Sequence, residues 1–231
     1  EIVFDKKRRS ILPKYSFPYV CLGDHLKQSG DASGHYFHQD LIVAREIYKR
    51  SPNVHFDVGS RVDGFIAHLL SFNQKIIIGD VRPLNFIDNF LEYRFIDLCN
   101  KDLNFDDSNI KYKSVSSLHV IEHIGLGRYG DPIDPLGYIN AIRNLARIVD
   151  KNGYLYLSHP VGFTRVEFNA HNVFSLDYIY QYILKNNLIY EEIHLINDEG
   201  NYILSTKDLN KAIKKSANFN YGCVVWILKK I

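Results

Sequence analysis

The amino-acid sequence predicts one doubly wound α/β domain, built on a mainly parallel sheet of seven strands with an antiparallel edge. The chain has 231 residues, 46% of them hydrophobic, which suits one domain with a substantial core. Beyond residue 50, short apolar runs alternate with stretches of helical periodicity, the pattern of βαβ units that build a parallel sheet. Two late apolar runs with a less regular stretch between them predict the antiparallel edge.

Each strand is expected where a short apolar run stands between turn residues or helical patterns. The expected strands are residues 54–58, 75–79, 93–96, 114–120, 154–158, 188–196 and 223–228. Helices are expected at 39–50, 62–70, 135–149 and 175–184, because apolar residues recur there three and four positions apart. Ser175 is placed to cap the last of these helices, and Gly153 to end the third in the left-handed conformation.

We expect the chain to divide at about residue 50 into two parts. Residues 51–231 form the α/β domain, and residues 1–50 form an N-terminal lid over the open edge of its ligand site. A glycine-rich stretch, residues 30–34, stands directly ahead of Tyr36 and Phe37. We therefore expect the residues before Gln39 to become ordered when a ligand binds.

The charge balance and the cysteines limit the kinds of partner. The chain has 28 Lys and Arg residues against 26 Asp and Glu, so its overall charge does not favour nucleic acid or an anionic membrane. The basic run at residues 6–9 is expected to be a solvated leader. Cys21, Cys99 and Cys223 are odd in number and far apart, which argues against a disulfide framework or a thiolate zinc site.

The same composition predicts a location. Scattered cysteines favour a reducing compartment. The sequence shows no apolar run with the length of a signal peptide or of a membrane-spanning helix. We therefore expect a cytoplasmic protein with no membrane span and no nucleic-acid partner.

The first expected strand ends in a turn that suits a ligand. Asp57, Gly59 and Ser60 stand between this strand and the next helix. A sharp turn there needs glycine, because the chain bends and a ligand must approach bare backbone. In an open α/β sheet, ligands bind at this place, outside the carboxyl ends of the strands. Plain strand–helix connections also use such glycines, so the turn indicates a ligand only together with other residues.

Acidic residues end the next two expected strands as well. Asp80 can accept hydrogen bonds from both hydroxyls of an adenosine ribose, and Asp97 can accept one from an adenine amino group. Each acid alone could be a loop residue or a helix cap. Three acids, Asp57 included, at the ends of three successive strands favour an adenosine-containing cofactor.

Arg61 distinguishes between the adenosine cofactors. A dinucleotide-binding turn has glycine at this position, so that the backbone can reach the pyrophosphate. S-adenosylmethionine has no pyrophosphate, and a single close glycine suffices for it. The sequence therefore predicts S-adenosylmethionine rather than NAD. The predicted cofactor-binding residues are Asp57, Gly59, Ser60, Arg61, Asp80, Asp97, Tyr36 and Phe37.

Over residues 36–231, the order of these motifs resembles the class I S-adenosylmethionine-dependent methyltransferase superfamily, whose fold is Rossmann-like. The phrases at 35–40 and 117–131 are similar to a methyltransferase-like family of unknown function, whose bacterial members are associated with surface-polysaccharide gene clusters. The resemblance implies that Asp57 and Gly59 lie beside the methionine part of the cofactor. It also implies that Asp80 binds the ribose and Asp97 contacts adenine. Arg61 departs from the superfamily, which usually has glycine there.

The fourth expected strand leads into the predicted catalytic residues His119, Glu122 and His123, and then into a glycine-rich loop that holds Arg128. In a doubly wound sheet this exit faces the methyl acceptor. Methyl transfer from a sulfonium is an in-line displacement, so the protein must position the acceptor and remove its proton. An aliphatic hydroxyl needs a base such as histidine, or a metal that lowers its pKa. Arg128 could hold a phosphate or carboxylate of the acceptor.

The H-x-x-E-H pattern of His119, Glu122 and His123 also suits a divalent metal cation. It is similar to E-x-x-E-H, which holds a divalent cation in the small-RNA 2′-O-methyltransferases and the ubiquinone O-methyltransferases. A fourth ligand could come from His159 or His171. The alternative is that Glu122 and His123 form hydrogen bonds within the loop and that one histidine is a plain general base.

Together these motifs predict an S-adenosylmethionine-dependent methyltransferase that acts on a small-molecule acceptor. The resemblance favours O-methylation of a sugar or nucleotide-linked sugar for a surface polysaccharide. The alternatives are an N- or carboxyl-methyltransferase, and a binding subunit that holds the cofactor without turnover.

Overall fold

A computed structural model describes residues 22–85, 88–101, 103 and 111–231. The chain divides into two units, Glu1–Ala32 and Ser33–Ile231. The described part of the first unit contains a short 3-10 helix, η1 (Asp24–Leu26). The basic run at 6–9 and Cys21 lie outside the described residues.

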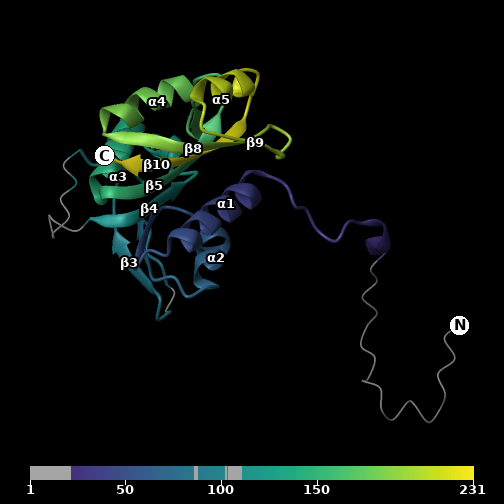
Figure 1. Cartoon of the computed structure of the whole chain (residues 1–231), viewed down its shortest axis with the longest axis horizontal. Helices are drawn as coiled ribbons and strands as arrows, with labels where there is room; N and C mark the ends of the chain where they lie inside the picture. The colour runs from purple at the N-terminus through teal and green to yellow at the C-terminus, as the bar shows by residue number, and fades with distance from the viewer. Residues whose placement is uncertain (1–21, 86–87, 102, 104–110) are drawn as a thin grey trace, which may run out of the picture. The chain divides into compact units, whose positions relative to one another are not determined.

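The second unit is built on a sheet of eight strands in the order β3-β2-β1-β4-β5-β10-β8-β9 (Figure 1). Neighbouring strands among the first five pair in parallel, whereas β10 pairs antiparallel with both β5 and β8. The strands are β1 (His55–Val58), β2 (Ile76–Asp80), β3 (Leu91–Phe95), β4 (Tyr112–Leu118), β5 (Val149–Val161), β8 (Leu188–Ile196), β9 (Tyr202–Thr206) and β10 (Gly222–Lys230). The predicted doubly wound α/β sheet with an antiparallel edge is confirmed. The predicted number of seven strands is wrong, because β9 adds an eighth at the edge.

The expected helices lie where they were predicted, but their lengths and helix types differ. The helices are α1 (His35–Arg50), α2 (Ala67–Leu70), α3 (Gly137–Ile148), α4 (Leu176–Lys185) and α5 (Leu209–Ser216). A π-helical turn, η2 (Val62–Ile66), precedes α2, and a 3-10 turn, η3 (Ile121–His123), follows β4. Strands β6 (Arg165–Glu167) and β7 (His171–Val173) form a separate small antiparallel sheet. Helix α1, which the sequence assigned to the lid, belongs to the second unit and contacts α2 and β10.

The end of α3 differs from the prediction. The helix stops at Ile148, and the chain continues without a loop into β5 at Val149. Asn152, not Gly153, takes the left-handed conformation, with φ of 60°. Gly153 is needed for close approach instead, since a Cβ there would lie 3.1 Å from the Cα of Lys113.

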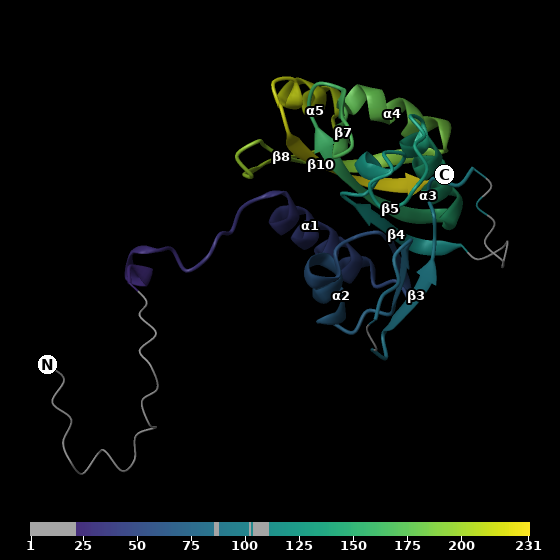
Figure 2. The ribbon, with the colours of Figure 1, turned by 180° about the vertical axis from the view of Figure 1, so that it is seen from behind.

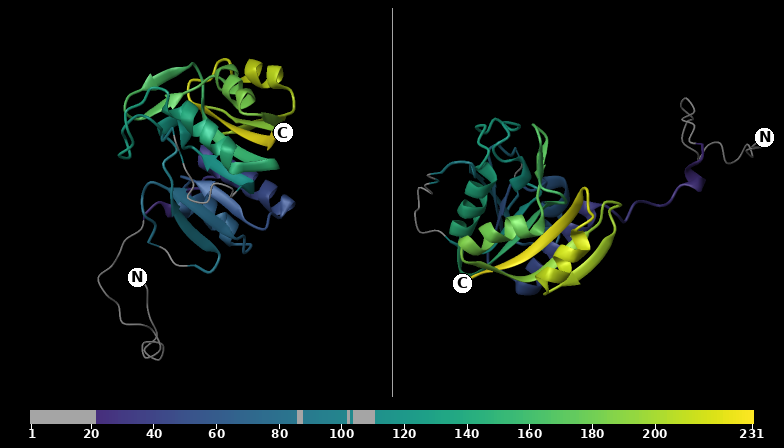
Figure 3. Two further views of the ribbon diagram at one scale, coloured as in Figure 1. Left: turned by 90° about the vertical axis from the view of Figure 1, so that its left-hand side faces the viewer. Right: turned by 90° about the horizontal axis from the view of Figure 1, so that it is seen from above.

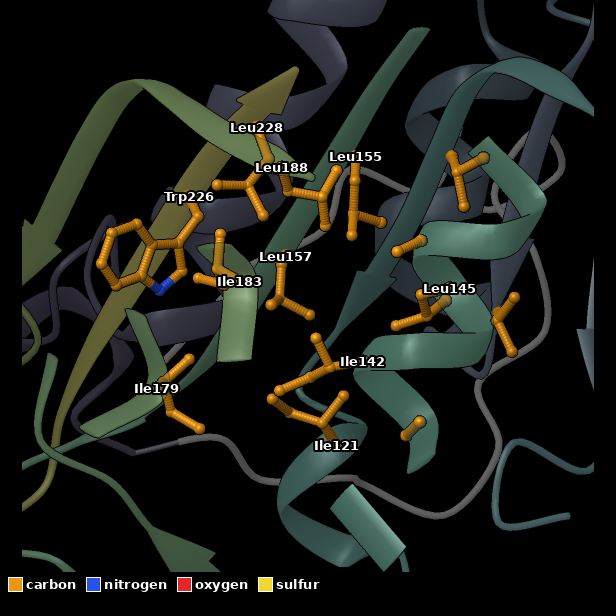
Figure 4. Packing of buried hydrophobic residues seen from close by; sticks show 14 of the residues in the cluster. Ile121, Ile142, Leu145, Leu155, Leu157, Ile179, Ile183, Leu188, Trp226 and Leu228 are labelled. Atoms are coloured by element: carbon orange, nitrogen blue, oxygen red, sulfur yellow. The ribbon is translucent and has the colours of Figure 1, made fainter. Parts of the chain in front are cut away.

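Two apolar clusters cover opposite faces of the sheet. Successive residues of β10 belong to one cluster and then the other, because neighbouring side chains of a strand point to opposite faces. Val224 and Trp226 belong to the cluster with α3 and α4, whereas Val225 and Ile227 belong to the cluster with α1 and α2. Figures 1 and 2 show these helices from the two sides. Figure 4 shows Trp226 in the first cluster, together with Ile142, Leu145, Ile179 and Ile183 from the helices.

Burial explains why β2 and β10 are largely apolar, and β1 is equally buried although it includes the polar residues His55 and Asp57. All four residues of β1 and the first seven of β10 are buried, because both faces of these strands are covered by helices. β10, coloured yellow, can be followed from above and from the side in Figure 3. In the part of the chain that the structure describes, no helix is long and apolar enough to cross a membrane.

Candidate active site

A cavity opens at the carboxyl ends of β1, β2 and β4, where the parallel strands meet the loops that follow them. His119, His123 and Asp80 are among the residues that line it. Its lining also includes Tyr36, Gly59, Arg61, Arg82, Asp97, Val120, Tyr129 and Asp131. Sequence positions 36 to 131 are thus brought to one place, where an open α/β sheet binds its ligands.

The loop after β1 is held from within by Asp57, which is fully buried. Its carboxylate accepts hydrogen bonds from the Ser60 amide (3.0 Å) and the Ser60 hydroxyl (2.6 Å), and a further one from the Ser116 hydroxyl. Burial raises the pKa of Asp57 to about 6, although these donors oppose the shift. Asp57 and Ser60 therefore shape the loop beneath the cavity and do not line it.

Gly59 sits at the point where this loop passes closest to the loop after β4. Its φ is 77°, and a Cβ there would lie 2.9 Å from Cγ1 of Val120. Its amide donates to the Gly79 carbonyl at 2.8 Å, which ties the ends of β1 and β2 together. Both the backbone conformation and the close approach require glycine.

We expect Gly59→Ala to lower the free energy of unfolding by about 1–3 kcal/mol, the usual cost of a side chain held in this backbone conformation. Urea denaturation measures the change. Gly130→Ala is the matched control, because Gly130 has φ of 87° and open space where its Cβ would stand. The contact with Val120 should make Gly59→Ala the more costly of the two. Equal losses would show that Val120 moves aside.

Asp80 ends β2 with its carboxylate held by Arg82. The Arg82 guanidinium donates to the Asp80 carboxylate from Nε (3.0 Å) and Nη2 (2.9 Å). The backbone amide of Arg82 also donates to Asp80 Oδ1, at 2.8 Å. The Arg82 side chain is 59% exposed and that of Asp80 14% exposed. An exposed guanidinium thus pairs with a mostly buried carboxylate on the cavity wall. Sequence reasoning missed Arg82, although it stands only two residues after Asp80.

Asp97 and Asp131 also line the cavity. Asp97 Oδ1 accepts from the Cys99 amide at 2.8 Å, a local turn bond. Asp131 Oδ2 accepts from the Gly125 amide at 2.7 Å and so closes the glycine-rich loop. The loop that holds Asp131 was expected on the acceptor side, but neither Asp131 nor Tyr129 was given a role at the site, because a glycine-rich loop has no periodicity from which to place its side chains.

Tyr36 and Phe37, the aromatic pair near the start of α1, lie in different surroundings. Tyr36 lines the cavity, and the Arg61 guanidinium lies 5.4 Å from the centre of its ring. Phe37 is 41% exposed and is not part of the lining. Arg61 also bonds Asp63 through Nη2 at 2.7 Å.

His119 and Glu122 form a buried pair directly after β4. His119 Nδ1 lies 2.7 Å from Glu122 Oε1, and the two side chains are 4% and 1% exposed. Burial acts against both charges, yet the pKa of His119 is raised, through Cys223 and Glu122, and the pKa of Glu122 is lowered through His119. A protonated His119 is a poor proton acceptor. Its backbone φ of 54° is uncommon for a residue other than glycine.

His123 is the histidine on the cavity wall that is suited to accept a proton. Its Nδ1 lies 2.8 Å from the Ala170 carbonyl oxygen. A carbonyl only accepts, so Nδ1 carries the hydrogen and Nε2 the lone pair. Burial lowers the pKa of His123, with Arg128 adding to the shift. Arg128 Nη1 donates to the same carbonyl at 2.8 Å, so Arg128 helps to position His123 and does not line the cavity.

The five residues predicted as metal ligands are not gathered in one cluster. His159 is fully buried, with Nδ1 2.8 Å from the Pro160 carbonyl and Nε2 accepting from Trp226 Nε1 at 3.1 Å. His171 Nε2 lies 3.0 Å from Glu167, and its ring centre is 6.5 Å from that of His123. Another group forms instead. Within the described ranges, His35, His119 and Cys223 are the one set of three ligand residues whose donor atoms lie within 4.8 Å of one another.

Comparison with solved structures identifies the fold. The chain is similar to geranyl diphosphate methyltransferase in complex with S-adenosylmethionine, with 10% identity and a TM-score of 0.58 over 84% of this chain and 85% of that one. It is also similar to a Burkholderia thailandensis 1,6-didemethyltoxoflavin-N1-methyltransferase with S-adenosylhomocysteine bound (9% identity, TM-score 0.56, 85% and 78% covered). A third is the N-methyltransferase NodS of Bradyrhizobium japonicum WM9 (10% identity, TM-score 0.53, 85% and 88% covered).

At these identities the likeness shows the fold, which is that of the class I methyltransferases and matches the resemblance noted in the sequence. No curated protein matches the chain. A family model matches residues 67–184, which span β2, β4, the loop with His119, Glu122 and His123, and α3. The chain therefore belongs to the family described as Caenorhabditis protein of unknown function, DUF268.

Proposed function

We propose that the protein is an S-adenosylmethionine-dependent methyltransferase that methylates a hydroxyl group of a small molecule. One observation carries the proposal: a single cavity has Gly59, Asp80 and Asp97 at the ends of three neighbouring strands and His123 on the wall after the fourth. The first group suits an adenosine cofactor, and the last residue suits proton removal from an acceptor.

In this reaction the chain binds and orients, and it accepts one proton. Asp80 accepts hydrogen bonds from the ribose hydroxyls, and Asp97 uses its second oxygen for the adenine amino group. Bound S-adenosylmethionine would supply the methyl group: the S–C bond would break with its electron pair left on sulfur as an O–C bond forms in line with it. His123 Nε2 takes the hydroxyl proton.

A sugar or nucleotide-linked sugar is the proposed acceptor. Tyr36 and Tyr129, which are 43% and 39% exposed, offer ring faces at the cavity against which the C–H groups of a sugar can pack. Arg82 and Arg128 lie near Tyr129, with guanidinium carbons 4.9 and 5.2 Å from its ring centre, and could attract a phosphate. The link to surface polysaccharide rests on the family resemblance in the sequence and stays a prediction, as does the cytoplasmic location.

Calorimetry followed by a transfer assay tests the proposal. S-adenosylmethionine and S-adenosylhomocysteine should bind and NAD should not. Labelled methyl groups should then appear on a hydroxyl in a panel of sugars, nucleotide-linked sugars, amines and carboxylic acids. Tight NAD binding, or no binding of either adenosyl compound, would overturn the cofactor. Methylation of nitrogen or a carboxylate would overturn the acceptor, and binding without any transfer would indicate a non-catalytic subunit.

A further inference from the structure

Three residues from distant parts of the chain meet beside the cavity, and one of them, His119, lines it. His35 is the first residue of α1, His119 follows β4, and Cys223 lies in β10. One ligand atom from each lies within 4.8 Å of the others. The rings of His35 and His119 are stacked, with centres 5.5 Å apart and planes inclined by 5°. We call these three residues the His–His–Cys cluster.

The two nitrogens of His119 have different surroundings. Nδ1 is bound to Glu122 Oε1 at 2.7 Å, whereas Nε2 is buried with no hydrogen-bond partner among the described residues. Buried polar atoms are nearly always partnered, so a free one indicates a missing ligand. Metal-binding histidines commonly give one ring nitrogen to a carboxylate and the other to the metal. The pair of His119 and Glu122 has this arrangement.

The donor set narrows the kind of metal. Two imidazole nitrogens and one thiol sulfur are typical ligands of Zn²⁺, and three protein ligands leave a fourth position open. Bonds of about 2.0–2.3 Å put tetrahedral ligand atoms about 3.3–3.7 Å apart. The present separations of up to 4.8 Å therefore require the three side chains to close by about 1 Å. Cys223 is fully buried and His119 nearly so, which shields the site on two sides.

We propose that the His–His–Cys cluster binds one Zn²⁺ through His119 Nε2, Cys223 Sγ and a ring nitrogen of His35, with Glu122 as a positioning residue for His119. On binding, His119 Nε2 and the Cys223 thiol each lose their proton to solvent, and the imidazole lone pair and the thiolate bond the metal. The site does not depend on the proposed methyl transfer. It would join α1 to β4 and β10, beside the cavity that His119 lines. The sequence predicted Glu122, His123, His159 and His171 as ligands; none of them is a ligand in this site.

Cobalt substitution tests the ligand set on the full chain without any methyl donor. Co²⁺ should bind one per chain and give a thiolate-to-cobalt charge-transfer band in the near ultraviolet. Cys223→Ser should abolish this band, whereas Cys21→Ser and Cys99→Ser should keep it. Circular dichroism shows whether each variant is folded. Binding without the band, or a band that survives in folded Cys223→Ser, would overturn the proposal.

Zinc affinity, measured by competition with a coloured chelator, tests the remaining residues. His119→Ala and His35→Ala should bind Zn²⁺ at least 100-fold more weakly, with His38→Ala on the same helix as the unaffected control. Glu122→Gln should weaken binding by about 10–100-fold, as loss of an orienting carboxylate does. An unchanged affinity in His119→Ala or in Glu122→Gln would contradict the arrangement. Because no cofactor is present, failure of the methyltransferase proposal leaves these results unaffected.

Discussion

Replacing His123 with alanine is expected to lower kcat for methyl transfer by about 10²- to 10⁴-fold, the usual contribution of a positioned general base. His123 lines the cavity, and its Nδ1 lies 2.8 Å from the Ala170 carbonyl oxygen and donates to it, which leaves Nε2 as the proton acceptor. The effect is measured with the acceptor identified in the transfer assay. Calorimetry should show S-adenosylmethionine binding close to that of the parent, because the imidazole serves the acceptor.

The pH profile separates a base from a merely structural histidine. Burial lowers the pKa of His123 below 6.5, and only the neutral imidazole accepts a proton. The rate should therefore fall as pH drops through this lowered pKa, and at pH 6.5 the parent should keep more than half of its plateau rate. His123→Ala should lose this limb. His68→Ala, at an exposed position in α2, is the matched control and should keep both rate and profile. Full activity in His123→Ala would contradict the base assignment.

Asp80→Ala should weaken binding of S-adenosylmethionine by about one to two decades. Loss of a charge-assisted hydrogen bond costs about 1.5–3 kcal/mol, and each decade corresponds to about 1.4 kcal/mol. Asp80 is mostly buried at the end of β2, where the ribose is proposed to lie. Asp80→Asn keeps one neutral hydrogen-bond acceptor, so its affinity for S-adenosylmethionine should lie between those of the parent and Asp80→Ala. Isothermal calorimetry measures all three proteins.

Arg82 provides the control for this experiment, because it holds the same carboxylate. The Arg82 side chain is 59% exposed, and an ion pair made by such a side chain contributes only about 0–1 kcal/mol, so Arg82→Ala should leave cofactor affinity within about fivefold of the parent. Any change should be toward tighter binding, since the ribose no longer competes with a guanidinium. Unchanged affinity in Asp80→Ala, or a large loss in Arg82→Ala, would show that Arg82 rather than Asp80 binds the cofactor.

The fold could be predicted from the sequence where burial determines the residue pattern. The expected strand at 188–196 has the bounds of β8 (Leu188–Ile196), because its apolar run reflects cover by helices. β9 was missed because it lies at the sheet edge and none of its five residues is buried, so no apolar run marks it. β5 begins five residues earlier than expected, since Val149 pairs with Tyr112 of β4 and an irregularity in this register spans the polar segment at 150–152.

The site could be predicted in part for a related reason. Gly59, Asp80 and Asp97 are found on the cavity because strand ends in a parallel sheet always share one edge. The order of residues along the chain could not show that the Asp57 carboxylate accepts a hydrogen bond from Ser60 within its own loop. It also could not show that His159 accepts one from Trp226. Nor could it show that Cys223 meets His35, since that contact needs α1 and β10 to be placed in three dimensions.

The place of β10 has a consequence for synthesis. Strands β1 to β5 leave the ribosome in an order that lets each pair with a neighbour already present, but β8 and β9 have no partner in that sheet until residues 222–230 follow. Until then the edge of β5 and the hairpin of β8 and β9 both expose unpaired backbone, the condition under which nascent chains aggregate or need chaperones. Insertion of β10 joins the two halves and brings Cys223 to His119 in the same step.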